Sequence, residues 1–273
     1  MEPSKQHAPP FPRHVVTSYQ DGPWGRLRSR AVGDPRPGVP EVVLVQGMAV
    51  ADYLMPGLGA FARWTRAHLV ELPGFAGSGE PPHELTVEEF GQAVADWLSA
   101  QPLERVVLAG HSSGTQVAAR AAVGHPDVAG VVLASPTIDP VARGPVRLLI
   151  RWRLDGRHEP PGLTESHRPE WKRAGPRRLL HLVRVHLADE LERTVRDLAV
   201  AVLVIRGADD RISTARWGRE LAALRPDGEY VELPGAHTFP WLHPQAWSEP
   251  VRRFATRVSS TNRQAEGRRK TRR

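Results

Sequence analysis

The apolar residues of the chain gather in short runs rich in valine, isoleucine and leucine, and longer segments of helical spacing separate these runs. Several runs are continuously apolar rather than alternating, as in parallel strands that helices cover on both faces. The runs span residues 41–45, 67–71, 105–109, 128–134, 199–205 and 229–233. Residues 14–31 are expected to add two antiparallel edge strands. The pattern predicts an α/β fold with a mostly parallel sheet of about eight strands.

One helix has a clear start signal. Thr86 is followed three residues later by Glu89, which is the signature of a capping box. Val87, Phe90, Val94 and Leu98 then share one helical face. Further helices are expected at residues 113–123, 214–224 and 247–257, where Pro250 should delay or kink the last one.

The alternation of strands and helices breaks between Pro136 and about Asp197. Two amphipathic segments, residues 145–154 and 177–193, occur there instead. Ligands of open parallel sheets bind beyond the carboxyl ends of the strands, so an insertion at this point would cover the site. We expect a core domain formed by residues 14–136 and 198–257, and a helical cap formed by residues 137–197.

The formal net charge of +7 is concentrated at the carboxyl end. After Val258 the chain has six basic residues against Glu266, and this segment contributes +5 of the total. We therefore expect a basic, disordered tail at residues 258–273 rather than a nucleic-acid-binding face, and no nucleic-acid partner.

Cysteine is absent, which excludes thiol catalysis and thiolate metal sites. Residues 1–13 are polar and rich in proline, so a flexible N-terminus is expected there rather than a signal peptide. No apolar run approaches the length of a membrane span. These features predict a cytoplasmic protein without a membrane partner; the oligomeric state is not predicted.

The chemistry is most visible at Gly110-His-Ser112-Ser-Gly114, a G-x-S-x-G sequence with Ser112 at its centre. It directly follows the apolar run 105–109 and opens a predicted helix. In a nucleophile elbow the serine sits on a sharp strand-to-helix turn, where flanking glycines avoid steric collisions. Ser112 is therefore a candidate nucleophile.

A serine nucleophile needs a base to remove its proton and an acid to orient that base. In this architecture the acid and then the histidine follow the serine along the chain. Asp209 and Asp210 follow one predicted strand, and His237 follows the next. Asp139, in an Asp-Pro turn that opens the insertion, is a third candidate acid.

The sequence resembles the serine hydrolases of the α/β-hydrolase fold. The resembling blocks are VVLVQGMAV, VELPGFAGSGEPP, LTVEEF, VVLAGHSSG, VLVIRGADDRIS and LPGAHTF. The insertion and the segment PTIDP also faintly resemble the meta-cleavage C–C hydrolases. The resemblance implies an α/β-hydrolase core with a cap.

In that family the acid usually lies three residues after the glycine that ends its strand, and the base follows a Pro-Gly-x turn. The resemblance thus selects Asp210 over Asp209 as the acid and His237 as the base. It also implies two backbone donors for an oxyanion, at Ser113 and Met48. This chain has Gln46 where family members commonly have histidine, and its amide could anchor the turn.

Other residues fit the walls of a pocket under the cap. Trp152, Phe239 and Trp241 are candidates for contact with an apolar substrate. The arginines beside Trp152 could bind a substrate carboxylate, although an arginine in water on an amphipathic helix is the favoured interpretation. His181 and His186 lack a carboxylate at metal-site spacing, so no metal ligand is assigned.

Together these residues predict a hydrolase without a cofactor, acting on a small-molecule carboxylic ester through an acyl-enzyme. A serine at position 112 argues against dehalogenase and epoxide hydrolase chemistry, which uses a carboxylate nucleophile there. Thioesters, lactones, C–C bonds and perhydrolysis remain open on the same triad, as does a ligand-binding protein without turnover.

Overall fold

A computed structural model describes residues 11–160 and 162–270, which form one eight-stranded sheet in the order β1-β2-β4-β3-β5-β6-β7-β8. The edge strands β1 and β2 run antiparallel to their neighbours, and β3 to β8 are parallel. The strands are β1 (Val16–Gln20), β2 (Leu27–Val32), β3 (Glu41–Val45), β4 (Ala67–Glu71), β5 (Val106–His111), β6 (Val128–Ala134), β7 (Ala201–Gly207) and β8 (Glu229–Leu233). The predicted α/β class and strand number are confirmed.

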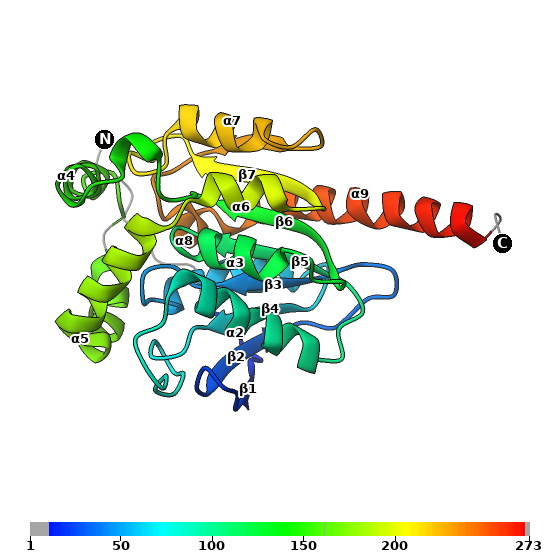
Figure 1. Cartoon of the computed structure of the whole chain (residues 1–273), viewed down its shortest axis with the longest axis horizontal. Helices are drawn as coiled ribbons and strands as arrows, with labels where there is room; N and C mark the ends of the chain where they lie inside the picture. Colours follow the sequence, from blue (N-terminus) through cyan, green and yellow to red (C-terminus); the bar gives the residue numbers. More distant parts are fainter. Residues whose placement is uncertain (1–10, 161, 271–273) are drawn as a thin grey trace.

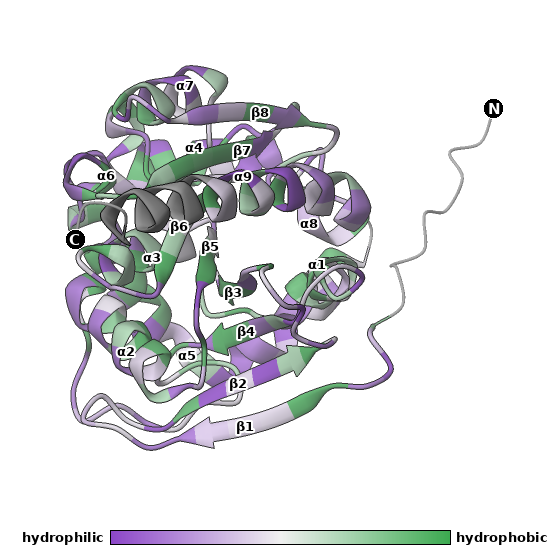
Figure 2. Ribbon diagram, turned by 90° about the vertical axis from the view of Figure 1, so that its right-hand side faces the viewer, coloured by the Kyte–Doolittle hydropathy of each residue, from purple (hydrophilic) through white to green (hydrophobic). Residues whose placement is uncertain are grey.

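Helices cover both faces of the sheet, which explains why the central strands are continuously apolar. One face packs against α2 (Val87–Ala100), α3 (Gly114–Ala122), α6 (Leu191–Asp197) and α7 (Ala215–Ala223). The other packs against α1 (Met55–Phe61), α8 (Phe239–Leu242) and α9 (Pro244–Lys270). Figure 2 shows the apolar colour of strands β5 and β7 between these layers.

The predicted capping box starts α2. The Thr86 hydroxyl accepts a hydrogen bond from the Glu89 amide at 3.2 Å, and the Glu89 carboxylate accepts one from the Thr86 amide at 2.7 Å. Both bonds satisfy amides that a helix start would otherwise leave unpaired.

The cap consists of α4 (Pro145–Asp155) and α5 (Leu163–Ala188), preceded by the short 3-10 helix η2 (Pro140–Ala142). Both cap helices lie beyond the carboxyl ends of the parallel strands (Figure 1). The segment 177–193, expected to be one helix, is divided between α5 and α6. Leu191 and Val195 of α6 are fully buried in the main core, so α6 belongs with the core helices rather than with the cap.

Helix α9 begins earlier and ends later than the sequence indicated. It starts at Pro244, passes through Pro250 and continues to Lys270, so residues 258–270 are helical rather than disordered. The core-facing stripe extends past the expected boundary because Val258 still packs in the buried cluster. Residues 271–273 of the tail, and residues 1–10 of the predicted flexible N-terminus, lie outside the described residues.

In the part of the chain that the structure describes, no helix combines the length and the apolar composition needed to cross a membrane.

Candidate active site

Ser112 lies at the turn between β5 and α3 with a backbone φ of 54°, a conformation that is costly for a residue with a side chain. The flanking glycines permit the turn. A Cβ at Gly110 would lie 2.2 Å from the Gly114 carbonyl oxygen, and a Cβ at Gly114 would lie 2.3 Å from the Gln46 carbonyl oxygen. The G-x-S-x-G spacing is thus required by backbone packing, and it holds the hydroxyl at the carboxyl end of the sheet.

The structure brings Ser112, His237 and Asp210 into one hydrogen-bonded chain, although they are far apart in sequence. His237 Nε2 lies 2.8 Å from Ser112 Oγ, and His237 Nδ1 lies 3.0 Å from Asp210 Oδ2. An ionised carboxylate only accepts hydrogen bonds, so Nδ1 donates to Asp210. In the neutral imidazole, Nε2 is then free to accept the Ser112 proton.

The electrostatics of the pair agree with this geometry. Burial lowers the pKa of the His237 imidazole, but the Asp210 carboxylate and the nearby Asp155 and Glu159 outweigh burial and raise this pKa to about 9. Burial raises the pKa of Asp210, yet His237 and the Ser213 amide outweigh it and hold that pKa below its ordinary value. The acid therefore stays ionised beneath the imidazole.

The two alternative acids lie elsewhere. Asp209 is exposed to solvent. Asp139 is buried, and its carboxylate is bound by Arg151 at 2.9 Å, Thr214 at 3.1 Å and Arg216 at 3.3 Å. Asp139 therefore fixes α4 to the loop after β7. Arg151 is one of the two arginines considered above as binding groups for a substrate carboxylate. In the structure its guanidinium pairs with the Asp139 carboxylate of the protein instead.

The two expected oxyanion donors are adjacent, but one is already engaged. The Met48 amide donates a hydrogen bond to Ser113 Oγ at 2.8 Å. Only the backbone of Ser113 was assigned a role from the sequence, but its side chain holds the loop that carries Met48. Gln46 does not anchor this turn as expected: its side chain is 1% exposed, and neither polar atom has a hydrogen-bond partner among the described residues.

A cavity of about 690 Å³ lies between the triad and the cap. Its floor contains Ser112 and His237, and its walls are mainly apolar. Trp152 lines it together with Leu148 and Leu149 of α4 and with Leu163, Trp171 and Val183 of α5. The space can hold a substantial apolar group next to the serine hydroxyl.

Phe239 and Trp241 do not line this cavity, contrary to expectation. Both are buried in the core cluster beneath the sheet, where the Phe239 ring lies 5.9 Å from that of Trp247. They belong to helix α8, which packs into the core directly after His237, and the Phe239 ring lies behind the site, 6.1 Å from the ring of His111.

The sequence of this chain matches the alpha/beta hydrolase family over residues 42–249. The chain belongs to this family. The matched range contains β3 except for its first residue, the strands β4 to β8, the turn at Ser112 and the cap.

Individual relatives of the hydrolase are distant. A 1-acylglycerol-3-phosphate O-acyltransferase from Arabidopsis thaliana is 31% identical over 100 residues, which is 34% of this chain and 24% of that protein. The match therefore spans about a quarter of that relative's length.

Solved structures share the fold of the hydrolase. A bacterial membrane phospholipase A has a TM-score of 0.73 at 19% identity, covering 89% of this chain and 86% of its own. The enol-lactonase from Burkholderia xenovorans LB400 has a TM-score of 0.70 at 20% identity, covering 88% of this chain and 100% of its own. At such identities the likeness concerns the fold alone.

Two residues near the triad of the hydrolase were not singled out from the sequence. Tyr53 Oη lies 2.5 Å from His111 Nδ1, and His111 Nε2 lies 2.9 Å from the His237 carbonyl oxygen. Burial and the neighbouring His237 lower the pKa of His111 to about 3, so the ring is neutral. It therefore accepts from Tyr53 and donates to the loop of the base. Position 111 is one of the two variable positions of G-x-S-x-G, so the motif gave no signal for it.

Two carboxylates of the cap bind the loops that carry the site. Glu159 accepts hydrogen bonds from the amide of Thr238, at 2.9 Å, and from its hydroxyl. Glu170 accepts from the amides of Ala51, at 2.9 Å, and Asp52, at 3.2 Å. Burial raises the pKa of each to about 7. The cap of the hydrolase is thereby attached on both sides of the cavity.

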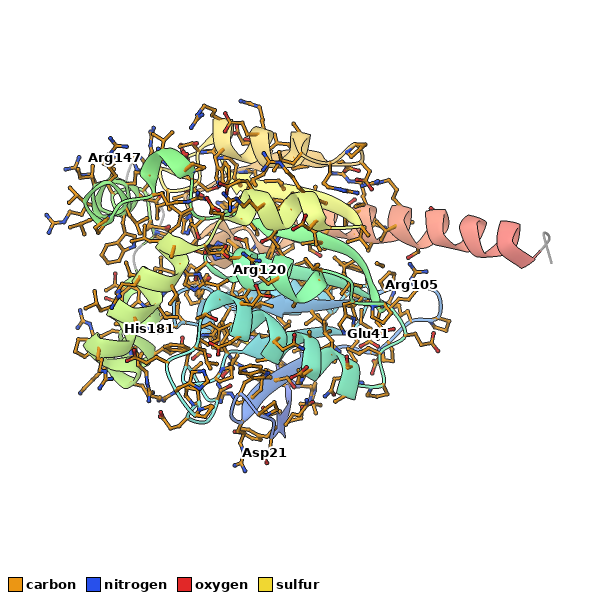
Figure 3. All side chains as sticks on the ribbon, in the orientation of Figure 1. Asp21, Glu41, Arg105, Arg120, Arg147 and His181 are labelled. Carbon is orange, nitrogen blue, oxygen red and sulfur yellow. The ribbon has the colours of Figure 1, made fainter. Side chains whose placement is uncertain are left out.

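The histidines of α5 do not form a metal site with neighbouring side chains. His186 is buried, and its Nδ1 lies 2.7 Å from Gln116 Oε1. His181 bonds the Leu85 carbonyl and lies on the outer part of α5 (Figure 3). Within residues 11–160 and 162–260 no three histidine or acidic side chains are arranged to hold a metal ion.

Proposed function

We propose that this hydrolase cleaves carboxylic esters with an apolar acyl group, using Ser112 as the nucleophile, His237 as the base and Asp210 as the orienting acid. The hydrogen-bonded chain from Ser112 Oγ through the imidazole to Asp210 carries the proposal. A hydroxyl at its ordinary pKa is a poor nucleophile, and this arrangement gives its proton an acceptor.

The proposed reaction has two halves. Ser112 Oγ attacks the ester carbonyl while its proton passes to His237 Nε2, and the alcohol leaves with that proton. Water then attacks the acyl-enzyme, losing a proton to the same nitrogen, and the acid is released as the Ser112 hydroxyl re-forms. Asp210 stays ionised and stabilises the imidazolium formed in each half.

The oxyanion would be stabilised by the Ser113 amide at the start of α3 and by the Met48 amide. In the resting structure the Met48 amide is occupied by Ser113 Oγ. An oxyanion that binds the Met48 amide must therefore compete with Ser113 Oγ for this donor. The Ser113 hydroxyl is thus part of the hydrogen-bond network of the proposed oxyanion site.

The apolar cavity supports an acyl chain as the group placed beside Ser112. Burying one methylene group contributes about 0.8 kcal/mol, or roughly fourfold in an equilibrium or rate constant. We expect kcat/KM for p-nitrophenyl esters to rise about fourfold per methylene from acetate until the cavity is filled. A flat or falling series would contradict an acyl pocket at this position.

A bulky side chain introduced into the cavity should remove the preference for long acyl chains. Val183 lines the cavity, whereas Leu180 on the same helix is 64% exposed. Val183→Trp is expected to lower kcat/KM for the longest accepted ester at least roughly tenfold, because several buried methylenes lose their space, and to leave the acetate ester within about twofold. Leu180→Trp is the matched control and should leave the whole series unchanged.

The activity should require a neutral His237. Because the pKa of this imidazole is raised above 6.5, to about 9, kcat/KM should rise with pH between these values, by about tenfold per unit well below the pKa. Glu159→Gln removes a negative charge that favours the imidazolium, so the ascending limb should move to lower pH.

The exposed Glu165 of α5 provides the control for this pH experiment. Glu165→Gln makes the same change of charge on the outer surface of the cap and should leave the profile in place. A profile of Glu159→Gln that coincides with the wild type, or moves to higher pH, would show that Glu159 does not act on the base.

A further inference from the structure

Helix α4 is anchored to the rest of the molecule mainly along a narrow stripe, and the Trp152 ring also lies 6.1 Å from the ring of Trp171 on α5. Leu148 and Arg151 are half-buried, and Asp155 is 2% exposed. These three residues are spaced three and four apart, so they share one side of the helix. Arg151 binds Asp139 at 2.9 Å, and the Asp155 carboxylate accepts the Arg211 amide at 2.8 Å. The helix is thus fixed in orientation while most of its circumference faces outward.

The outward part of α4 is unusually apolar. Val146, Ile150 and Leu154 follow one another at four-residue spacing and are 69%, 54% and 42% exposed. Leu149 and Trp152 beside them are 47% and 51% exposed. Together these five residues form what we call the α4 apolar face. Monomeric proteins rarely expose contiguous apolar surface of this kind without a partner.

The exposed charged side chains of α4 itself and of the turn that follows it have a single sign. Arg147, Arg153 and Arg157 are exposed beside it, and the acidic residue of the helix, Asp155, is buried. Arg147 lies at the end of the molecule (Figure 3), where its guanidinium donates a hydrogen bond to the Val141 carbonyl at 2.9 Å. Arg153 follows Leu149 by four residues and Ile150 by three, so it lies among these apolar side chains. An exposed apolar helix face that contains tryptophan and arginines can lie in a bilayer interface, where long basic side chains reach the phosphates.

Contact between the α4 apolar face and a bilayer would bring the lipid close to the cavity above Ser112. Leu149 and Trp152 belong both to the α4 apolar face and to the cavity wall above Ser112. A surface that covers this face would therefore lie next to the apolar cavity. Helix α9 runs away from the cap (Figure 1), so residues 258–270 are not part of this face.

We propose that the α4 apolar face and its arginines dock on the surface of an anionic phospholipid bilayer, with the cap toward the lipid. Apolar side chains enter the boundary between headgroups and acyl chains, while the guanidinium groups pair with lipid phosphates. The proposal differs from the expectation of no membrane partner, and the contact it describes is peripheral and needs no spanning helix. Docking does not depend on the catalytic role of Ser112.

Vesicle co-sedimentation tests the docking. The wild type should bind phosphatidylcholine vesicles that contain phosphatidylglycerol and bind pure phosphatidylcholine more weakly. Val146→Asp/Ile150→Asp should weaken binding roughly tenfold or more, because two charges enter the apolar face. Arg153→Glu should weaken it by at least about fivefold, the effect of one lost basic residue near an anionic surface.

Matched substitutions away from the cap separate a specific face from general attraction of a basic protein. Val123 is 44% exposed at the end of α3 remote from the cap, and Arg253 is exposed on α9. Val123→Asp and Arg253→Glu should retain binding, as should Arg268→Gln/Arg269→Gln in the tail. Equal losses in cap and control variants would overturn the proposal, and so would binding that only the tail variant abolishes.

Two further measurements keep docking and catalysis apart. Ser112→Ala should bind vesicles as the wild type does, whatever its activity. Val146→Asp/Ile150→Asp should keep its turnover of a soluble short-chain ester, which shows that it is folded. If the wild type instead sediments as a dimer without lipid and the double variant as a monomer, the face is an interface between two copies, and bilayer docking is wrong.

Discussion

Replacing Ser112 with alanine is expected to lower kcat for ester hydrolysis by about a millionfold, to the level left by binding and oxyanion stabilisation. The reason is geometric, since His237 Nε2 lies 2.8 Å from Ser112 Oγ and no other hydroxyl bonds this nitrogen among the described residues. Ester turnover and the mass of a fluorophosphonate adduct measure the effect. The wild type should gain one adduct, and the variant none.

Ser113 provides the neighbouring control. Its hydroxyl accepts the Met48 amide and does not bond His237, so Ser113→Ala should retain the adduct, mapped to Ser112 by peptide fragmentation. An adduct on Ser113 in the wild type would overturn the assignment of the nucleophile. A folded wild type without any adduct or ester turnover would favour a ligand-binding role.

Replacing Asp210 with asparagine is expected to lower kcat by about 10⁴-fold with little change in KM. The amide can donate to Nδ1, which favours the imidazole tautomer with its proton on Nε2, and that nitrogen then cannot accept from Ser112. The paired negative charge is also lost, so the pKa of His237 should fall. Steady-state kinetics over a range of pH separate the two effects.

The other two candidate acids supply the comparison for Asp210. Asp209 is exposed, so Asp209→Asn should change kcat less than about twofold. Asp139 binds Arg151 and Arg216, so Asp139→Asn should lower the free energy of unfolding and loosen α4 while keeping most of kcat. A loss at Asp139 as large as that at Asp210 would contradict the assignment.

Much of the fold and of the proposed triad was predictable because their signals are local. Continuous apolar runs gave the buried strands, the Thr86–Glu89 pair gave the start of α2, and the glycines around Ser112 gave the turn. The acid and base follow their strands in chain order. Parallel strands bring their carboxyl ends to one edge, so order along the chain becomes proximity in space.

The features that could not be predicted depend on contacts between distant segments. Phe239 and Trp241 were expected in the cavity because they follow His237, but α8 turns them into the core. Glu159 and Glu170 have no motif, and their importance appears only once the cap is placed over the loops at Ala51 and Thr238. Their raised pKa values likewise come from burial in the folded chain.

The glycine at position 114 has a consequence for how new specificities can arise in this scaffold. Its missing side chain lets the turn at Ser112 touch the Gln46 backbone directly, so any larger residue would push apart the turn that carries Ser112 and the loop that carries Met48. Substitutions at Gly110 and Gly114 are therefore not tolerated, however small the added side chain. When random mutant libraries are selected for altered substrate preference, the selected substitutions should accumulate in α4 and α5, whose side chains line the cavity. Gly110 and Gly114 should be conserved in all active variants.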